Sequence, residues 1–219
     1  MACGREIFEG DFCKECKDSL PFNDKKICDH CGRAVKFAED YCSTCKGTLV
    51  SLDKCRSVFN YQPPISTLIK KMKYDNCRYL ADVFSSYLSS LYFKNYFNAD
   101  YLTYVPMTEK ARKKRGYNQS QLLAQSLSAK IGVPVAHCVV KTKETTRQAK
   151  LNRADRLKNL IDVFKINDKK LIKDKKVVIV DDVTTTGATS QAVAELLKKA
   201  GALQVYLITV ASVPPFDKY

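Results

Sequence analysis

Val177 to Thr189 reads VVIVDDVTTTGAT and contains, in direct succession, an apolar strand, an acidic pair and a hydroxyl-rich turn. Val177 to Val180 is apolar throughout, which is typical of a strand buried on both faces of a parallel sheet. Asp181 and Asp182 follow at the carboxyl end of this strand, where open parallel sheets bind their ligands. The stretch therefore predicts an α/β fold with a ligand site directly after the strand.

The turn after the aspartates has the composition of a phosphate site. Residues 183–189 supply four threonine hydroxyls, one glycine and a run of backbone N–H groups just before a predicted helix. Unpaired N–H donors and the helix dipole favour an anion there, and Gly187 permits close backbone approach or positive φ. Asp181 and Asp182 could accept hydrogen bonds from vicinal sugar hydroxyls or help to hold a metal ion. Together these features indicate a sugar phosphate, whereas either fragment alone would suit a surface acidic pair or a threonine helix cap.

Apolar periodicity predicts alternating helices and strands around this stretch. A break is expected at Tyr61 to Pro64. The predicted helices are 65–72, 80–97, 120–131 and 188–200, with a helical or irregular stretch at 152–160; the predicted strands are 101–107, 177–180 and 205–211, with an edge strand at 161–166. Strands that alternate with helices indicate a parallel sheet covered on both faces.

The chain's 219 residues leave room for one full domain and a small module. Residues 1–50 contain cysteine pairs and short polar turns, so we expect a cysteine-rich domain at 1–50 and an α/β domain at 51–219. The first 50 residues hold 8 Lys and Arg against 9 Asp and Glu, so the excess positive charge of the chain, +14 overall, lies beyond them. Such a field favours polyanions or phosphorylated ligands, although basic composition alone is weak support.

Six of the ten cysteines form three CxxC pairs. The spacing Cys28-x2-Cys31-x10-Cys42-x2-Cys45 is that of a four-thiolate zinc ribbon. Four protein thiolates leave no open position for water, so we expect a structural zinc ion rather than a catalytic one.

The third pair, Cys13 and Cys16, has an incomplete partner pair, because Cys3-Gly4 resembles only half of a zinc knuckle. Either a first ribbon is incomplete, or this third pair competes with the last pair for Cys28 and Cys31.

No run approaches the roughly 18 consecutive apolar residues of a membrane span, and the first residues carry charges where a signal peptide is apolar. We therefore expect a cytoplasmic protein without a membrane span.

The stretch Val177 to Thr189 closely resembles the phosphoribosyl pyrophosphate signature of type I phosphoribosyltransferases: four apolar residues, two acidic residues and a loop ending in T-G-x-T. The resemblance implies a type I phosphoribosyltransferase fold in which Asp181 and Asp182 contact the ribose hydroxyls. It also implies magnesium, bound together with the ligand 5-phosphoribosyl-1-pyrophosphate. The remaining implied ligand contacts are Val183, Thr184, Thr185, Thr186, Gly187, Ala188 and Thr189 in the phosphate turn, and Pro106, Met107 and Thr108 in a pyrophosphate loop.

Two further stretches, Arg115 to Gln119 and Gln148 to Asn159, are similar to the R-G-[FY]-N-Q and Q-x-x-L-x-x-x-x-R-x-x-N elements of the ComF family. Members of this family pair an N-terminal zinc ribbon with a phosphoribosyltransferase-like domain, and many are competence proteins needed in natural transformation. The resemblance extends to Tyr61 and to Lys73-Tyr74. It implies single-stranded DNA and other competence proteins as partners. Phosphoribosyl transfer stays open, as does the alternative of a metabolic transferase with an unidentified acceptor and no DNA role.

Further ligand or DNA contacts are expected from Arg115, Tyr117, Asn118, Gln119, Gln148, Arg153 and Arg156. Lys110 to Arg115 holds five basic residues in six, which suits a phosphate-binding edge, a nucleic-acid contact or a soluble loop. Asn118 could equally cap a helix, and Tyr117 is a candidate for base stacking. The resemblance implies that residues 141–158 take the place of the mobile loop that closes over pyrophosphate in the wider fold, with a solvated basic helix as the alternative.

Overall fold

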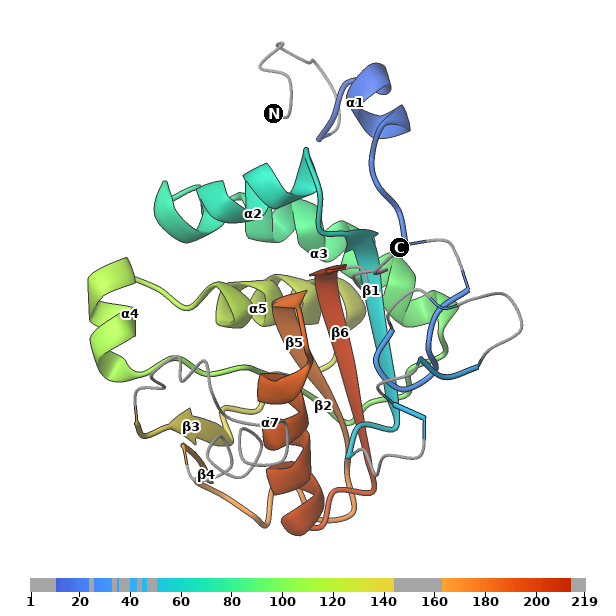
Figure 1. Cartoon of the computed structure of the whole chain (residues 1–219). Helices are drawn as coiled ribbons and strands as arrows, with labels where there is room; N and C mark the ends of the chain where they lie inside the picture. Colours follow the sequence, from blue (N-terminus) through green and yellow to red (C-terminus); the bar gives the residue numbers. More distant parts are fainter. Residues whose placement is uncertain are drawn as a thin grey trace, which may run out of the picture.

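The computed structural model describes residues 11–23, 26–32, 35, 40–42, 45–46, 51–143 and 163–213. Its centre is a four-stranded parallel sheet with the strand order β1-β6-β5-β2 (Figure 1). The strands are β1 (Lys54–Asn60), β2 (Tyr101–Tyr104), β5 (Lys176–Thr184) and β6 (Gln204–Ser212). The predicted α/β class with a parallel sheet is confirmed.

Helices cover both faces of this sheet. On one face α2 (Ile65–Tyr74), α3 (Leu80–Lys94) and α5 (Gln119–Ile131) share a buried cluster with the strands, and on the other face lies α7 (Ala188–Lys199). Side chains alternate along β5, so Val178 and Val180 enter the first cluster while Val177 and Ile179 enter the second. This two-sided burial explains why the strand is apolar at every position.

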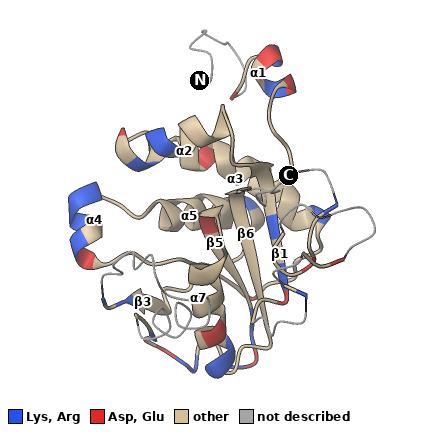
Figure 2. Cartoon of the chain, in the orientation of Figure 1, with Lys and Arg blue, Asp and Glu red and all other residues tan. Residues whose placement is uncertain are grey.

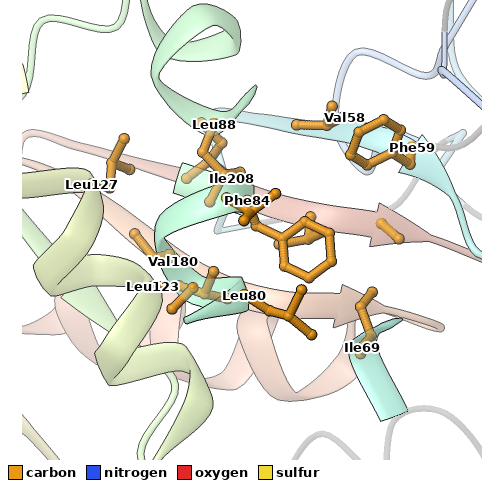
Figure 3. Close-up of a cluster of buried hydrophobic side chains, with 14 of the residues drawn as sticks. Val58, Phe59, Ile69, Leu80, Phe84, Leu88, Leu123, Leu127, Val180 and Ile208 are labelled. Carbon is orange, nitrogen blue, oxygen red and sulfur yellow. The ribbon is translucent and has the colours of Figure 1, made fainter. Parts of the chain in front are cut away.

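The larger cluster holds the sheet and its helices together. Figure 3 shows Phe84 and Leu88 of α3 and Leu123 of α5 gathered over Val180 and Ile208. These side chains are fully buried. Burial of each is worth about 1.5–3 kcal/mol, so the cluster supplies a rigid base for the loops at the carboxyl ends of the strands.

The carboxyl ends of three elements differ from the sequence prediction by more than two residues. The strand β2 ends at Tyr104, because Pro106 lacks an N–H group and the last ladder bond runs from the Val105 amide to the Val180 carbonyl. The strand β5 continues through the two aspartates to Thr184, paired with β6 throughout. Helix α3 ends at Lys94, since Tyr96 has a φ of +52° that a helix cannot accommodate.

A small antiparallel ribbon of β3 (Val139–Lys141) and β4 (Phe164–Ile166) stands apart from the main sheet. The prediction of a sheet-edge strand at 161–166 was therefore wrong in its partner, because β4 pairs with β3. Residues 161–162 and the predicted stretch at 152–160 lie outside the described residues. The strand β1 was not predicted at all.

The basic stretch after β2 forms the helix α4 (Glu109–Arg115), so the interpretation as a soluble loop was wrong. Thr108 caps its start, because its hydroxyl oxygen accepts a hydrogen bond from the Ala111 amide at 3.2 Å. Gly116 ends it with a φ of +86°.

The N-terminal residues pack against the edge strand β1 and the helices beside it. Helix α1 (Lys14–Asp18) places Cys16 in the larger hydrophobic cluster. Gly32 has a φ of +68° and lies so close to β1 that a Cβ atom would meet the Cys55 carbonyl oxygen at 2.8 Å, so only glycine fits. Asp29 forms an ion pair with Arg56 at 3.2 Å.

The division of the chain at residues 50 and 51 stays a prediction. No helix in the described ranges has both the length and the apolar character to cross a bilayer.

Candidate functional site

The acidic pair is buried at the carboxyl end of β5. Asp181 is 9% exposed and Asp182 is 3% exposed. The Ser120 hydroxyl, at the start of α5, donates to Asp181 Oδ1 at 2.7 Å, and the Asp182 amide donates to the same oxygen at 2.9 Å. The Val183 amide donates to Asp182 Oδ1 at 2.7 Å. These bonds hold both carboxylates in fixed positions.

A lysine from α2 neutralises one of the two carboxylates. Lys73 Nζ lies 2.7 Å from Asp182 Oδ2, and the lysine side chain is only 21% exposed. Burial by itself would lower the pKa of Lys73, but the charge of Asp182, their hydrogen bond and the charge of Asp181 together raise it, so the ammonium stays charged. The family resemblance included Lys73, but sequence reasoning assigned no role to it or to Ser120, because neither is near the aspartates in the chain.

The pKa of Asp181 is raised to about 7. Burial is the main cause, since it disfavours the ionised carboxylate, and the neighbouring charge of Asp182 adds to it. Hydrogen bonds from Ser120 and the Asp182 amide, and the charge of Lys73, act in the opposite direction. The Asp181 carboxyl therefore holds a proton near neutral pH unless a ligand donates hydrogen bonds to it.

The phosphate turn connects β5 to α7 as the sequence predicts. Thr185 and Thr186 are exposed, whereas Thr184 is buried at the strand end. Gly187 is the N-cap residue of α7 with a φ of +74°, a conformation that glycine adopts without strain. The first-turn amides of a helix have no backbone partner within it. The Ala188 amide donates to the Thr186 hydroxyl at 3.4 Å, and this end of α7, directly after the aspartates, favours an anion.

The loop after β2 leaves the sheet at the same edge as the acidic pair, because β2 pairs in parallel with β5 and Tyr104 lies opposite Val180. Pro106 and Thr108 are buried, and Met107 is partly buried. The Thr108 hydroxyl oxygen accepts the Ala111 amide and so caps α4. The structure thus brings both predicted ligand loops together.

Asn118 is a helix cap. Its side-chain oxygen accepts hydrogen bonds from the amides of Ser120 at 3.0 Å and Gln121 at 3.5 Å, and its amide nitrogen donates to the Val105 carbonyl at 3.1 Å. The residue therefore joins the loop after β2 to α5. Of the two roles considered for Asn118, capping is the one present.

The other residues of the R-G-Y-N-Q stretch contact α2 and the segment after it. The Tyr117 ring is 7% exposed, and its hydroxyl donates to the Met72 carbonyl, so the interpretation of Tyr117 as a base-stacking residue was wrong. Arg115 donates to Gln119 Oε1 at 2.6 Å, and its guanidinium lies 5.4 Å from the Tyr74 ring centroid. Gln148, Arg153 and Arg156 lie outside the described residues.

Four cysteine sulfurs form a second candidate site, remote in sequence from the acidic pair. The sulfur atoms of Cys28, Cys31, Cys42 and Cys45 all lie within 4.8 Å of one another. Zinc–sulfur bonds of about 2.3 Å in a tetrahedron place sulfurs about 3.8 Å apart, so the group fits a zinc ion. The spacing prediction for this group is confirmed.

The protonation chemistry of the group also suits a cation. Burial raises the pKa of the Cys28 thiol, and the hydrogen bond with Cys31, together with burial, raises that of Cys45. A metal ion removes this cost because it neutralises the thiolates. Cys16 and its neighbour Cys13 belong instead to the cluster around α2 and α3, and Cys3 lies outside the described residues.

Comparison with known proteins adds independent findings. The family model described as "Phosphoribosyl transferase domain" matches residues 99–215. The chain is 30% identical to competence protein F of Haemophilus influenzae, over 91% of this chain and 89% of that protein. It is 31% identical to the DNA utilization protein YhgH of Escherichia coli, over 83% of this chain and 82% of that protein. Among solved structures, it resembles a glutamine phosphoribosylpyrophosphate amidotransferase from B. subtilis with a TM-score of 0.43 and 22% identity, covering 60% of this chain and 26% of that one.

Proposed function

The chain belongs to the ComF family of phosphoribosyltransferase-domain proteins, and from this premise we propose that it binds 5-phosphoribosyl-1-pyrophosphate together with magnesium. One observation carries the proposal: two buried carboxylates stand directly before the turn that opens α7. Carboxylates accept hydrogen bonds from sugar hydroxyls, and first-turn amides bind phosphate. A ligand that carries vicinal hydroxyls next to a phosphate fits both at once.

Each part of the site has a separate task in this proposal. Asp181 and Asp182 accept hydrogen bonds from the two ribose hydroxyls, and the turn from Thr184 to Thr189 holds the 5-phosphate. The loop at Pro106 to Thr108 leaves the sheet beside them and faces the pyrophosphate. These residues orient the ligand and exclude water; none of them is a covalent nucleophile in the proposal.

The residues present fit magnesium only as an ion held largely by the ligand and by water. Both aspartates already have partners in Ser120 and Lys73, so few protein oxygens remain for an octahedral ion. When bound, magnesium would supply positive charge that neutralises the pyrophosphate.

We propose further that the protein acts in natural transformation, in the cytoplasm, where it handles incoming single-stranded DNA with other competence proteins. The names of the two relatives, competence protein F and DNA utilization protein, support this role. A surface near the ligand site supports it as well. We call it the basic–aromatic surface, and its residues are Tyr74, Arg78, Tyr79, Lys113, Lys114 and Arg115.

The basic–aromatic surface joins the end of α2 to α4, and Figure 2 shows the concentration of Lys and Arg along α4. Tyr74 is 72% exposed and Tyr79 is 54% exposed, so their rings are available to bases. Cations lie against aromatic rings here, with the Arg78 guanidinium 4.6 Å from the centroid of the buried Tyr117 ring. Exposed rings beside cations are the combination that binds single strands without reading their sequence.

Tyr74→Ala/Tyr79→Ala is expected to weaken the binding of a single-stranded oligothymidylate by at least about 10-fold, because base stacking is worth about 1–3 kcal/mol per ring. Fluorescence anisotropy with a labelled oligonucleotide measures this. Tyr96→Ala is the matched control, since Tyr96 is 91% exposed but follows α3 outside the surface. Equal affinities for the double variant and the control would contradict the assignment of this surface.

An active phosphoribosyltransferase with an unidentified acceptor and no DNA role is the second candidate function. The same ligand site supports it, because positioning and charge neutralisation are what such a transfer requires of the protein. Calorimetric titration of the full chain with 5-phosphoribosyl-1-pyrophosphate and magnesium is expected to show saturable binding, and absence of binding would refute both candidates. Pyrophosphate release with an added acceptor favours the second candidate. DNA binding with a steep salt dependence and no pyrophosphate release favours the first.

A further inference from the structure

Lys73 reaches the acidic pair from an element that no ligand motif includes. It lies in the last turn of α2, and the helix runs across the carboxyl ends of β5 and β6 (Figure 1). The adjacent Met72 is fully buried, and its carbonyl accepts the hydroxyl of Tyr117. This anchoring fixes the backbone on which Lys73 is mounted.

The contact between Lys73 and Asp182 is close and shielded. The two charged atoms are 2.7 Å apart, and the side chains are 21% and 5% exposed. A buried ion pair of this kind is costly to disrupt, because removal of one partner leaves the other charge without compensation. The pair therefore persists unless something else neutralises Asp182.

The charge at the site matters because the proposed ligand is a polyanion. Two ionised carboxylates would repel the phosphates of a sugar phosphate, and a divalent cation is one way to remove that repulsion. The ammonium of Lys73 removes part of it without a bound metal. It also leaves the other oxygen of Asp182, which accepts from the Val183 amide, in a fixed position.

We propose that Lys73 is a positioning residue of the ligand site. Its ammonium serves as a built-in counter-cation of the acidic pair and so reduces the dependence of sugar-phosphate binding on magnesium. The inference rests on the proposed function, because it assumes that Asp182 meets the ribose hydroxyls. Lys73 acts through Asp182 and takes no part in bond making or breaking.

The test compares wild type with Lys73→Met, which keeps the apolar stem of the side chain and removes the charge. Calorimetry measures affinity for 5-phosphoribosyl-1-pyrophosphate and for ribose 5-phosphate, each with excess magnesium and with a chelator. Lys73→Met is expected to lose roughly 10-fold or more in affinity with the chelator and clearly less with excess magnesium. Lys73→Arg is expected to recover most of the loss, since it restores the charge.

Two further variants separate this role from a general effect on charge or folding. Lys71→Met removes an exposed charge from the same helix and is expected to leave the magnesium dependence unchanged. Lys73→Met combined with Asp182→Asn is expected to lose less than the sum of the two single losses, because the residues act as a unit.

The outcomes are distinguishable from those of the function itself. If wild type binds neither ligand under any condition, the proposed function fails and the inference fails with it. If wild type binds, and the ratio of the affinity in magnesium to the affinity in chelator is the same for Lys73→Met as for wild type, only the inference is overturned. This outcome includes an equal loss of affinity by Lys73→Met under both conditions.

Discussion

Asp181→Ala/Asp182→Ala is expected to lower the affinity for 5-phosphoribosyl-1-pyrophosphate by at least about 100-fold. In the proposed site each carboxylate accepts a charge-assisted hydrogen bond from a ribose hydroxyl, and two such bonds are worth about 3–6 kcal/mol together. Calorimetric titration in excess magnesium measures the loss. Asp100→Ala is the matched control: Asp100 accepts from the Lys176 amide at the opposite end of β5. An unchanged affinity in the double variant would refute the site.

The double variant is expected to remain folded, because removal of the buried Asp181 offsets part of the cost of leaving Lys73 without its partner Asp182. The pKa of Asp181 is raised to about 7 from an ordinary value of 3.8. Between these two pH values the folded chain holds a proton that the unfolded chain releases, so this residue makes the free energy of unfolding fall as pH rises through that window. Loss of Asp181 removes that pH-dependent decrease. Urea unfolding at pH 5 and pH 8 measures the difference, and a steeper decrease in the variant would contradict the stated cause.

Cys28→Ser/Cys31→Ser is expected to lose the bound zinc and to lower stability by at least about 2 kcal/mol, or about 4–8 °C in Tm. Metal binding orders the cysteine group, and that group packs on β1 through the close approach of Gly32 to Cys55. Metal analysis of the purified protein and thermal unfolding measure the two effects.

Cys13→Ser/Cys16→Ser is the matched control for the zinc prediction, because it changes the same kind of CxxC pair in a different cluster. The control is expected to keep the zinc held by the other two pairs. Complete loss of metal in this control would contradict the assignment of the four ligands, and it would favour a site that includes the third pair. Retention of zinc by Cys28→Ser/Cys31→Ser would contradict it as well.

The features that sequence predicted well are those that neighbouring residues determine together. The stretch from Val177 to Thr189 is a buried strand, an acidic pair and a helix-opening turn because each part has its own local pattern. The cysteine group has the same property, since each CxxC pair forms one turn that presents two sulfurs. The parallel direction of the strands follows from apolar runs that alternate with helices.

The features that sequence missed depend on contacts between distant segments. Ser120 donates to Asp181 across 61 positions of the chain, and nothing in either local pattern indicates it. Tyr117 was expected at the surface, but packing against α2 buries it. The strand β1 has no distinctive apolar run, and it is a strand because β6 offers it a ladder of hydrogen bonds.

The amino-acid sequence by itself therefore determined the ligand chemistry expected at the end of β5, the four clustered cysteines and the α/β class. Each depends on spacing along a short segment, where backbone geometry alone brings the groups together. Tertiary structure alone decided the electrostatic state of the site, because Lys73 reaches Asp182 only after α2 packs across the sheet. Burial raises the pKa of Asp181, and for Lys73 the effect of burial is outweighed by the charges of the two aspartates, which raise its pKa. Both effects exist only in the folded chain.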